Sequence, residues 1–244
     1  MQKNTVLLVI IAALGGFIAG FGLANSINRS QPAIIPAKSE SSSAINSAPA
    51  DKDQDLSPAE IQAKIAEADK EPRNFQFQKD LGLALYKYAT MKQDPSLLGE
   101  AARILGRARE LQPKDADVLI GLGNAQFDLG YARKNNENFL SARELYTQAL
   151  DVKPGDADVS TDRSLTYLFQ EPPDYAKASS ELQKVVESNP KHERSLQFLV
   201  QALAKQGKKG DAENALSKLK KLDPQNRAIS DLEAQLKDPD TGTK

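Results

Sequence analysis

Hydrophobic residues divide the chain into three parts with different patterns. Residues 5–24 read TVLLVIIAALGGFIAGFGLA, an apolar run without a single charge. Residues 25–56 are rich in Ser, Ala, Pro and Asn, and their apolar residues follow neither a strand period nor a helix period. From residue 57 to about 237, apolar positions recur with helical spacing. This pattern predicts an all-α body over 57–237, a disordered linker over 25–56 and an unstructured tail over 238–244.

Signals for helix ends mark both limits of the body. Ser57 is suited to be an N-cap, Pro58 to be the first helical residue, and Glu60 to close a capping box. At the other end, an apolar stripe with helical spacing predicts a final capping helix. The stripe consists of Ile229, Leu232 and Leu236.

Regularly spaced prolines indicate an internal repeat within the body. From Pro72 onward, prolines that follow helix-like segments are separated by 41, 41, 36 and 34 residues. When the units are aligned on these prolines, a small residue recurs 12 positions before each, at Ala101, Ala142, Ala178 and Ala212. A larger apolar residue recurs 8 positions before each, at Leu105, Tyr146, Leu182 and Leu216. Small and large residues in such a register are expected where two helices of a pair pack closely.

These residues resemble the tetratricopeptide repeat (TPR), a helix-turn-helix unit of 34 residues that carries small residues at fixed positions and a proline near its end. The resemblance implies a right-handed superhelix of about four units with capping helices. Seven extra residues between the helices of each of the first two units predict either longer paired helices or longer loops. Arg163 and Val200 depart from the family pattern, because a Leu and a small residue are expected there.

The N-terminal segment, residues 1–24, contains the apolar run at 5–24, which is long enough to cross a bilayer because about 20 helical residues span about 30 Å. The segment is interpreted as a transmembrane anchor, with a cleaved signal sequence as the alternative. Either interpretation places the repeats across a membrane, so we expect a single-pass protein of a bacterial inner membrane with its TPR domain in the periplasm. A stripe of small residues at Ala12, Gly16, Gly20 and Ala24 suggests weak homodimerisation.

Composition and motifs argue against several classes of function. The 32 basic and 33 acidic residues leave no positive excess for nucleic acid, and the absence of cysteine rules out thiolate chemistry. No metal-binding, phosphate-binding or hydrolase motif occurs in the sequence, and the single histidine, His192, stands at a helix start, where a solvated or capping role is expected. We therefore expect no catalytic residue, metal or cofactor.

The resemblance instead implies a binding groove formed by the first helix of each unit. The residues of this chain that occupy the family's groove positions form a mixed polar and apolar surface. Such a surface suits a protein or peptide partner better than a metabolite. The groove is expected to contain Lys79, Leu83, Tyr86, Asp117, Ile120, Asn124, Phe127, Asp128, Leu165, Leu168, Phe169 and Gln201, flanked by Gln76, Lys87, Asp158, Thr161, Arg194, Gln197, Ala204 and Lys205. Its centre is expected at Ile120, Asn124, Phe127, Leu165 and Phe169, although Phe127 or Phe169 would instead be a core residue if it lay between helices.

Two functions fit this layout. The first is a non-enzymatic scaffold or adaptor that is tethered to the membrane and binds a polypeptide, as in cytochrome c biogenesis, whose membrane-anchored TPR factors are similar in layout, or in the assembly of another envelope complex. The second is a structural subunit of a translocon or secretion machine.

Overall fold

The computed structural model describes residues 57–237, which form ten α-helices and no strand within that range. Contacts divide the chain into two units, residues 1–63 and residues 64–244. The predicted anchor, its small-residue stripe, the linker and the tail lie outside the described residues, and none of the described helices is long and apolar enough to cross a membrane. The helices are α2 (Pro58–Lys70), α3 (Phe75–Lys92), α4 (Pro95–Leu111), α5 (Ala116–Arg133), α6 (Asn136–Val152), α7 (Ala157–Phe169), α8 (Tyr175–Ser188), α9 (Glu193–Lys205), α10 (Lys209–Leu222) and α11 (Ile229–Lys237).

Most of these helices begin at a side chain that caps their free backbone N–H groups. Ser57 and Glu60 form the predicted capping box before α2, with Ser57 N 2.8 Å from the Glu60 carboxylate. Asp115 and Asp156 cap α5 and α7 by accepting hydrogen bonds from the backbone three residues further on. Such caps typically contribute about 1 kcal/mol each, and they fix where each helix starts.

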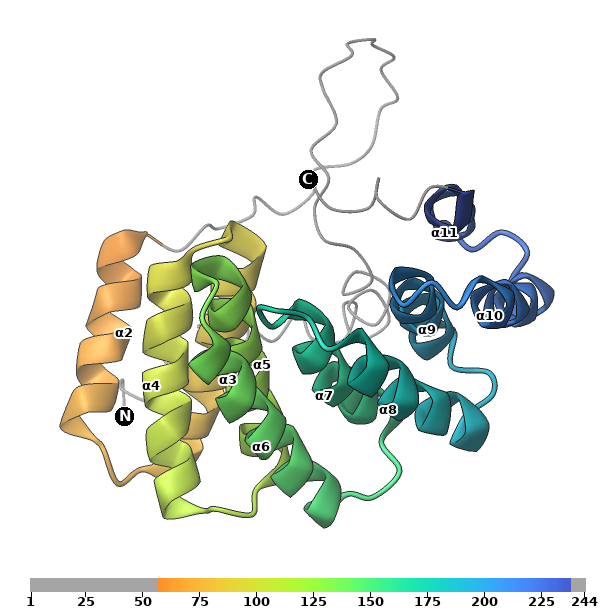
Figure 1. Cartoon of the computed structure of the whole chain (residues 1–244). Coiled ribbons are helices and arrows are strands. Elements are labelled where there is room, and N and C mark those ends of the chain that lie inside the picture. Colours follow the sequence, from red (N-terminus) through yellow and green to blue (C-terminus); the bar gives the residue numbers. More distant parts are fainter. Residues whose placement is uncertain (1–56, 238–244) are drawn as a thin grey trace, which may run out of the picture. The chain divides into compact units, whose positions relative to one another are not determined.

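The second unit is built from successive helix pairs (Figure 1). The pairs are α3 with α4, α5 with α6, α7 with α8 and α9 with α10, and α11 packs on α9 and α10. The first helices of neighbouring pairs also touch, in the order α3, α5, α7, α9 and α11. We call the surface formed by α3, α5, α7 and α9 the A-helix face.

The predicted register of small and large residues is present in the packing. The recurring alanines and the recurring larger residues are all buried at these contacts, as Ala101, Ala142, Ala178, Ala212, Leu105, Tyr146, Leu182 and Leu216. Val200, which departs from the pattern, is also fully buried, and Arg163 forms an ion pair with Glu181 at 2.6 Å instead of entering the core. In α11 the predicted stripe is buried at Leu232 and Leu236.

The extra residues of the first two units lengthen their helices rather than their loops. The helices α3 and α5 have 18 residues each and α4 and α6 have 17, whereas α7 and α8 have 13 and 14. Only Gln93 and Asp94 separate α3 from α4. The first two pairs therefore extend about one turn further than the third.

Two glycines offer a direct test of this packing. A Cβ at Gly123 would lie 2.8 Å from Cε1 of the buried Tyr146 ring, whereas a Cβ at Gly106 in α4 would meet nothing within 4 Å. Replacing glycine by alanine in a helix stabilises the folded state by about 1 kcal/mol where there is room for the methyl group. Where the space is already filled, the added methyl group destabilises the folded state by about 1–3 kcal/mol. We expect Gly106→Ala to be more stable than Gly123→Ala by about 1–3 kcal/mol in urea unfolding of the full chain. Equal stabilisation by both substitutions would contradict a tight contact at Gly123.

Candidate functional site

The A-helix face contains most of the residues that the sequence analysis places in a groove, with different degrees of exposure. Asp117 is exposed, and a partly buried group consists of Lys79, Leu83, Tyr86, Ile120, Phe127, Asp128, Phe169 and Gln201. Leu165, Leu168 and Asn124 are buried, at 3%, 8% and 8% exposure. The structure thus packs the Leu165 and Leu168 side chains into the core around α7 to α11, rather than presenting them at the surface.

An ionic contact joins α3 to α5. The ammonium group of Lys79 lies 2.9 Å from a carboxylate oxygen of Asp115 and 2.9 Å from one of Asp117. Burial works to lower the pKa of Lys79, but the hydrogen bonds to the two carboxylates raise it, and the pKa lies above its ordinary value. The hydrogen bond from Lys79 holds the pKa of Asp117 below its ordinary value, so this exposed carboxylate is charged at neutral pH. Further along the same two helices, the Tyr86 hydroxyl donates to Asp128 at 2.8 Å.

An aromatic contact joins α5 to α7. The Phe127 and Phe169 rings meet edge to face with centroids 5.8 Å apart, and both are partly buried against the core. Tyr131, one turn after Phe127 on α5, contacts the Phe169 ring in the same way at 5.6 Å and is 54% exposed. The sequence analysis did not select Tyr131, although its spacing of four residues from Phe127 places both on one side of the helix. Phe127, Tyr131 and Phe169 are called the aromatic step below.

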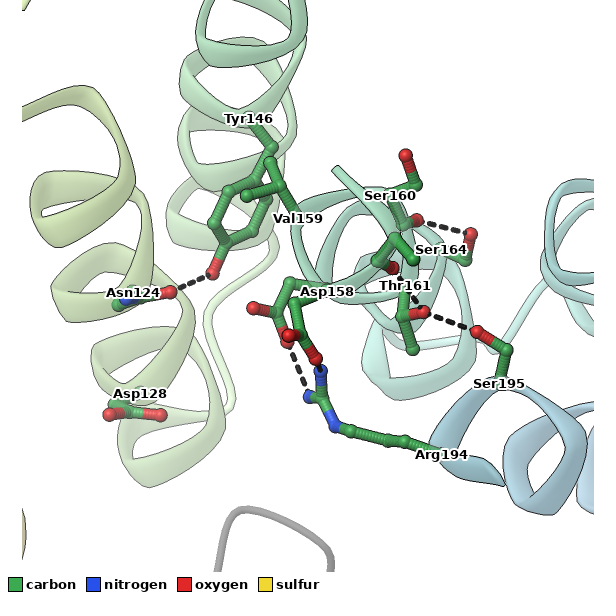
Figure 2. A network of polar contacts seen from close by, with 12 residues as sticks. Asn124, Asp128, Tyr146, Asp158, Val159, Ser160, Thr161, Ser164, Arg194 and Ser195 are labelled. Carbon is green, nitrogen blue, oxygen red and sulfur yellow. Dashed lines mark hydrogen bonds and ion pairs between the residues drawn. The ribbon is translucent and has the colours of Figure 1, made fainter. Parts of the chain in front are cut away.

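A buried polar contact joins α7 to α9 (Figure 2). The Arg194 side chain extends from α9 to α7, where its guanidinium donates to Asp162, and each side chain of this pair is only 9% exposed. A second guanidinium nitrogen lies 3.8 Å from Asp158, whose side chain is 62% exposed. Within the described residues, Arg194 Nε is buried without a hydrogen-bond partner. Removing one member of such a buried charge pair typically costs about 3–5 kcal/mol, because the other charge stays buried.

A chain of contacting polar side chains, two hydroxyls, an imidazole and a carboxylate, runs beside this ion pair. Thr161 Oγ1 and Ser195 Oγ are 2.6 Å apart, Ser195 Oγ is 2.6 Å from His192 Nδ1, and His192 Nε2 is 3.3 Å from Asp158. Ser, His and Asp in contact resemble the residue types of a hydrolase triad. Ser195, however, has no exposed surface, so no substrate carbonyl can reach its oxygen. We assign these contacts to the packing of α7 against α9.

The amide of Asn124 on the A-helix face is oriented from behind, by a residue of α6 (Figure 2). The Tyr146 hydroxyl of α6 donates to Asn124 Oδ1 at 2.9 Å. Within the described residues, Asn124 Nδ2 makes no hydrogen bond, so its two N–H groups are available as donors. Asn124 and Asp128 lie one turn apart on α5.

Residues 57–237 contain no group of three or more His, Asp or Glu side chains arranged to hold a metal ion. The A-helix face instead combines oriented hydrogen-bonding groups with an exposed aromatic ring. This combination is suited to binding rather than to bond cleavage.

Comparison with known proteins agrees with this description of the fold. Residues 173–236 match the family model described as tetratricopeptide repeat. No curated protein matches the sequence. Among solved structures, MamA is 18% identical with a TM-score of 0.52, and the match covers 76% of this chain and 86% of that one. The C-terminal part of a TPR repeat-containing protein from Cytophaga hutchinsonii is 20% identical with a TM-score of 0.54, and the match covers 71% of this chain and 65% of that one.

Proteins of this repeat class are generally non-enzymatic scaffolds that bind peptides or proteins. The matched family model covers α8 to α10 and most of α11, and the structural neighbours share the fold of the longer array. The tetratricopeptide repeat match thus applies to residues 173–236, and the solved structures show that the rest of the helical array shares this fold.

Proposed function

We propose that the chain is a non-enzymatic scaffold whose A-helix face binds an extended segment of a partner polypeptide. The observation that carries the proposal is the aromatic step, because it places an exposed Tyr131 ring against Phe169, about two turns beyond the oriented amide of Asn124 on the same helix. Aromatic rings dominate many protein interfaces because they bury a large area and lose little conformational entropy. The amide of Asn124 supplies a donor for a backbone carbonyl of the bound segment.

Tyr131 is the better anchor candidate of the three rings. Phe127 and Phe169 are partly buried against the core, so replacing either with Ala would lower the free energy of unfolding and obscure any change in binding. The Tyr131 ring meets the Phe169 ring edge to face, and the Tyr131 side chain is 54% exposed. A partner side chain that stacks on it would gain a preformed surface.

The proposal extends to location. The uncharged run at 5–24 and the linker at 25–56 support a single-pass protein of a bacterial inner membrane that holds its TPR domain in the periplasm. This layout supports capture of a polypeptide during cytochrome c biogenesis or during assembly of another envelope complex.

A photo-crosslinking amino acid at position 131 tests the binding surface in living cells. We expect a discrete adduct with one or few proteins, because an exposed ring beside the A-helix face would contact the bound segment. Leu140 on α6 is 51% exposed and provides a matched control position. An adduct of equal yield from position 140, or none from 131, would contradict the proposed surface.

The partner identified in that way permits a measurement of affinity. Tyr131→Ala is expected to raise Kd about 5–30-fold, equivalent to about 1–2 kcal/mol for an interface anchor. Leu140→Ala should leave Kd unchanged, and both variants should melt at the wild-type temperature because their side chains are exposed. Isothermal titration calorimetry and a thermal melt of the full chain provide the two measurements. A Kd that does not change with Tyr131→Ala would remove Tyr131 from the interface.

The proposed location has its own test. An uncleaved anchor should keep the full chain in the membrane fraction after washing with alkaline carbonate, because about 20 apolar residues partition into the bilayer. A mature chain that begins at Asn25 and is found in a soluble fraction would show export with cleavage instead.

A further inference from the structure

The third helix pair contains an ion pair at positions where the other units have apolar residues. Nine positions after the preceding proline, the four units carry Leu81, Leu122, Arg163 and Leu199. Nine positions before the following proline, they carry Ile104, Leu145, Glu181 and Ala215. In the third unit the guanidinium of Arg163 donates to Glu181 at 2.6 Å, and the two side chains are 28% and 11% exposed. Replacing such a pair by apolar residues is often neutral or stabilising, so stability alone does not explain its presence.

Two further cations contact the same carboxylate. The ammonium groups of Lys177 and Lys184 lie 3.6 and 3.4 Å from Glu181, and their side chains are 48% and 67% exposed. Burial works to raise the pKa of Glu181, but the neighbouring cations lower it, and the pKa lies below its ordinary value. Glu181 is therefore charged at neutral pH, and one carboxylate meets three positive side chains.

A fourth cation, Arg143 of α6, lies on the same side of α7. Its guanidinium lies 3.7 Å from the centroid of the Tyr167 ring, and it donates through Nε to Thr166 and through Nη2 to Gln170. Within residues 57–237, Nη1 makes no hydrogen bond, and it stays open to solvent. Burial lowers the pKa of Arg143, and the neighbouring Tyr167 and Asp174 offset this only in part. Neutral groups thus hold this guanidinium in place and leave one nitrogen available to a ligand.

These four cations form one group with a positive net charge. Tyr167 follows Arg163 by one turn of α7, so the guanidinium above the ring lies beside the Arg163 side chain. Two carboxylates oppose the group, Glu181 within ion-pair distance and Asp174 from further away, which leaves a net charge of +2. The term cation cluster is used below for Arg143, Arg163, Lys177 and Lys184.

The length of the cation cluster favours a chain of anions over a single anion. Lys177 and Lys184 are seven residues apart on α8, which corresponds to about 10 Å along the helix. In an extended polypeptide, side chains two residues apart point to the same side and are about 7 Å apart, so successive carboxylates can reach different cations. Nucleic acid also carries repeated anions, but Tyr167 is covered by Arg143 and packed against the core, so its ring cannot stack on a base.

We propose that the cation cluster binds an acidic segment of a polypeptide. Alternate carboxylates of the segment would pair with Lys177, with Lys184 and with Nη1 of Arg143. The cluster lies on the side of α7 that contacts α6 and α8. The site is therefore separate from the A-helix face and does not depend on the function proposed for that face.

The chain contains no cysteine, so a single labelled cysteine can report on the cation cluster. Thr147 is exposed on α6, one turn after Arg143. Thr147→Cys in the full chain, held in detergent micelles, carries an environment-sensitive fluorophore, and the probe is the synthetic peptide GEGEGEG with blocked ends. We expect a saturable change in emission that is lost when glutamine replaces every glutamate of the peptide. The same label at Ser217, which is exposed on α10, should not respond.

Two double substitutions with the same change in charge separate the cluster from general attraction. Lys177→Gln with Lys184→Gln should raise Kd for the peptide about tenfold, because two of the paired cations are lost. Lys209→Gln with Lys221→Gln, at exposed positions of α10, should change Kd less than about threefold. Should the first variant misfold by circular dichroism, Lys184→Gln alone should raise Kd about threefold.

Several outcomes would overturn the proposal. No saturable response to the peptide, equal weakening by both double substitutions, or undiminished binding of the glutamine peptide would each do so. An equal response to inorganic phosphate at the same ionic strength would show that a single anion suffices. A response to an eight-nucleotide oligothymidylate or to anionic phospholipid vesicles, but not to the peptide, would assign the cluster to nucleic acid or to lipid instead.

Discussion

The close contact of Gly123 with Tyr146 determines how α5 can display polar groups on the A-helix face. Because Gly123 has no Cβ, the Tyr146 ring packs directly on the α5 backbone, and its hydroxyl then reaches Asn124, the next residue of the helix. One packing contact thus buries a large ring, satisfies its hydroxyl and orients an amide. Leu105 and Leu182 take the place of Tyr146 in the neighbouring units and are equally buried, but a leucine has no hydroxyl that could orient an amide.

The three joints between successive first helices rely on different physical interactions. A partly buried ion pair at Lys79 joins α3 to α5, aromatic edges join α5 to α7, and the buried Arg194–Asp162 pair joins α7 to α9. The first is weakened by salt, the second is not, and the third is costly to break because a lone charge would remain buried. An array stabilised mainly by contacts between neighbours therefore has joints that respond differently to salt and to mutation.

The sequence predicted the helical body and much of its core because both depend on short-range spacing. The prolines and the recurring alanines indicate which helix pairs with the next, whereas the same register left open whether the extra residues of the first two units lengthen helices or loops. The exposure of individual groove residues could not be predicted in this way. Leu165 and Leu168 follow family positions, but their burial depends on how α9 packs on α7, and the Asp162–Arg194 pair joins residues 32 apart whose partnership no local spacing reveals. Tyr131 was overlooked because it lies outside the positions the family uses.

The helix α9 is held in the array by two kinds of contact. Its first turn carries Arg194 and Ser195, which contact α7 through buried polar groups. Its later turns carry Leu199, Val200 and Leu203, which are buried in the core. Because apolar packing fixes the helix before the polar groups must meet, the buried ion pair with α7 specifies the register of the two helices more than it adds stability.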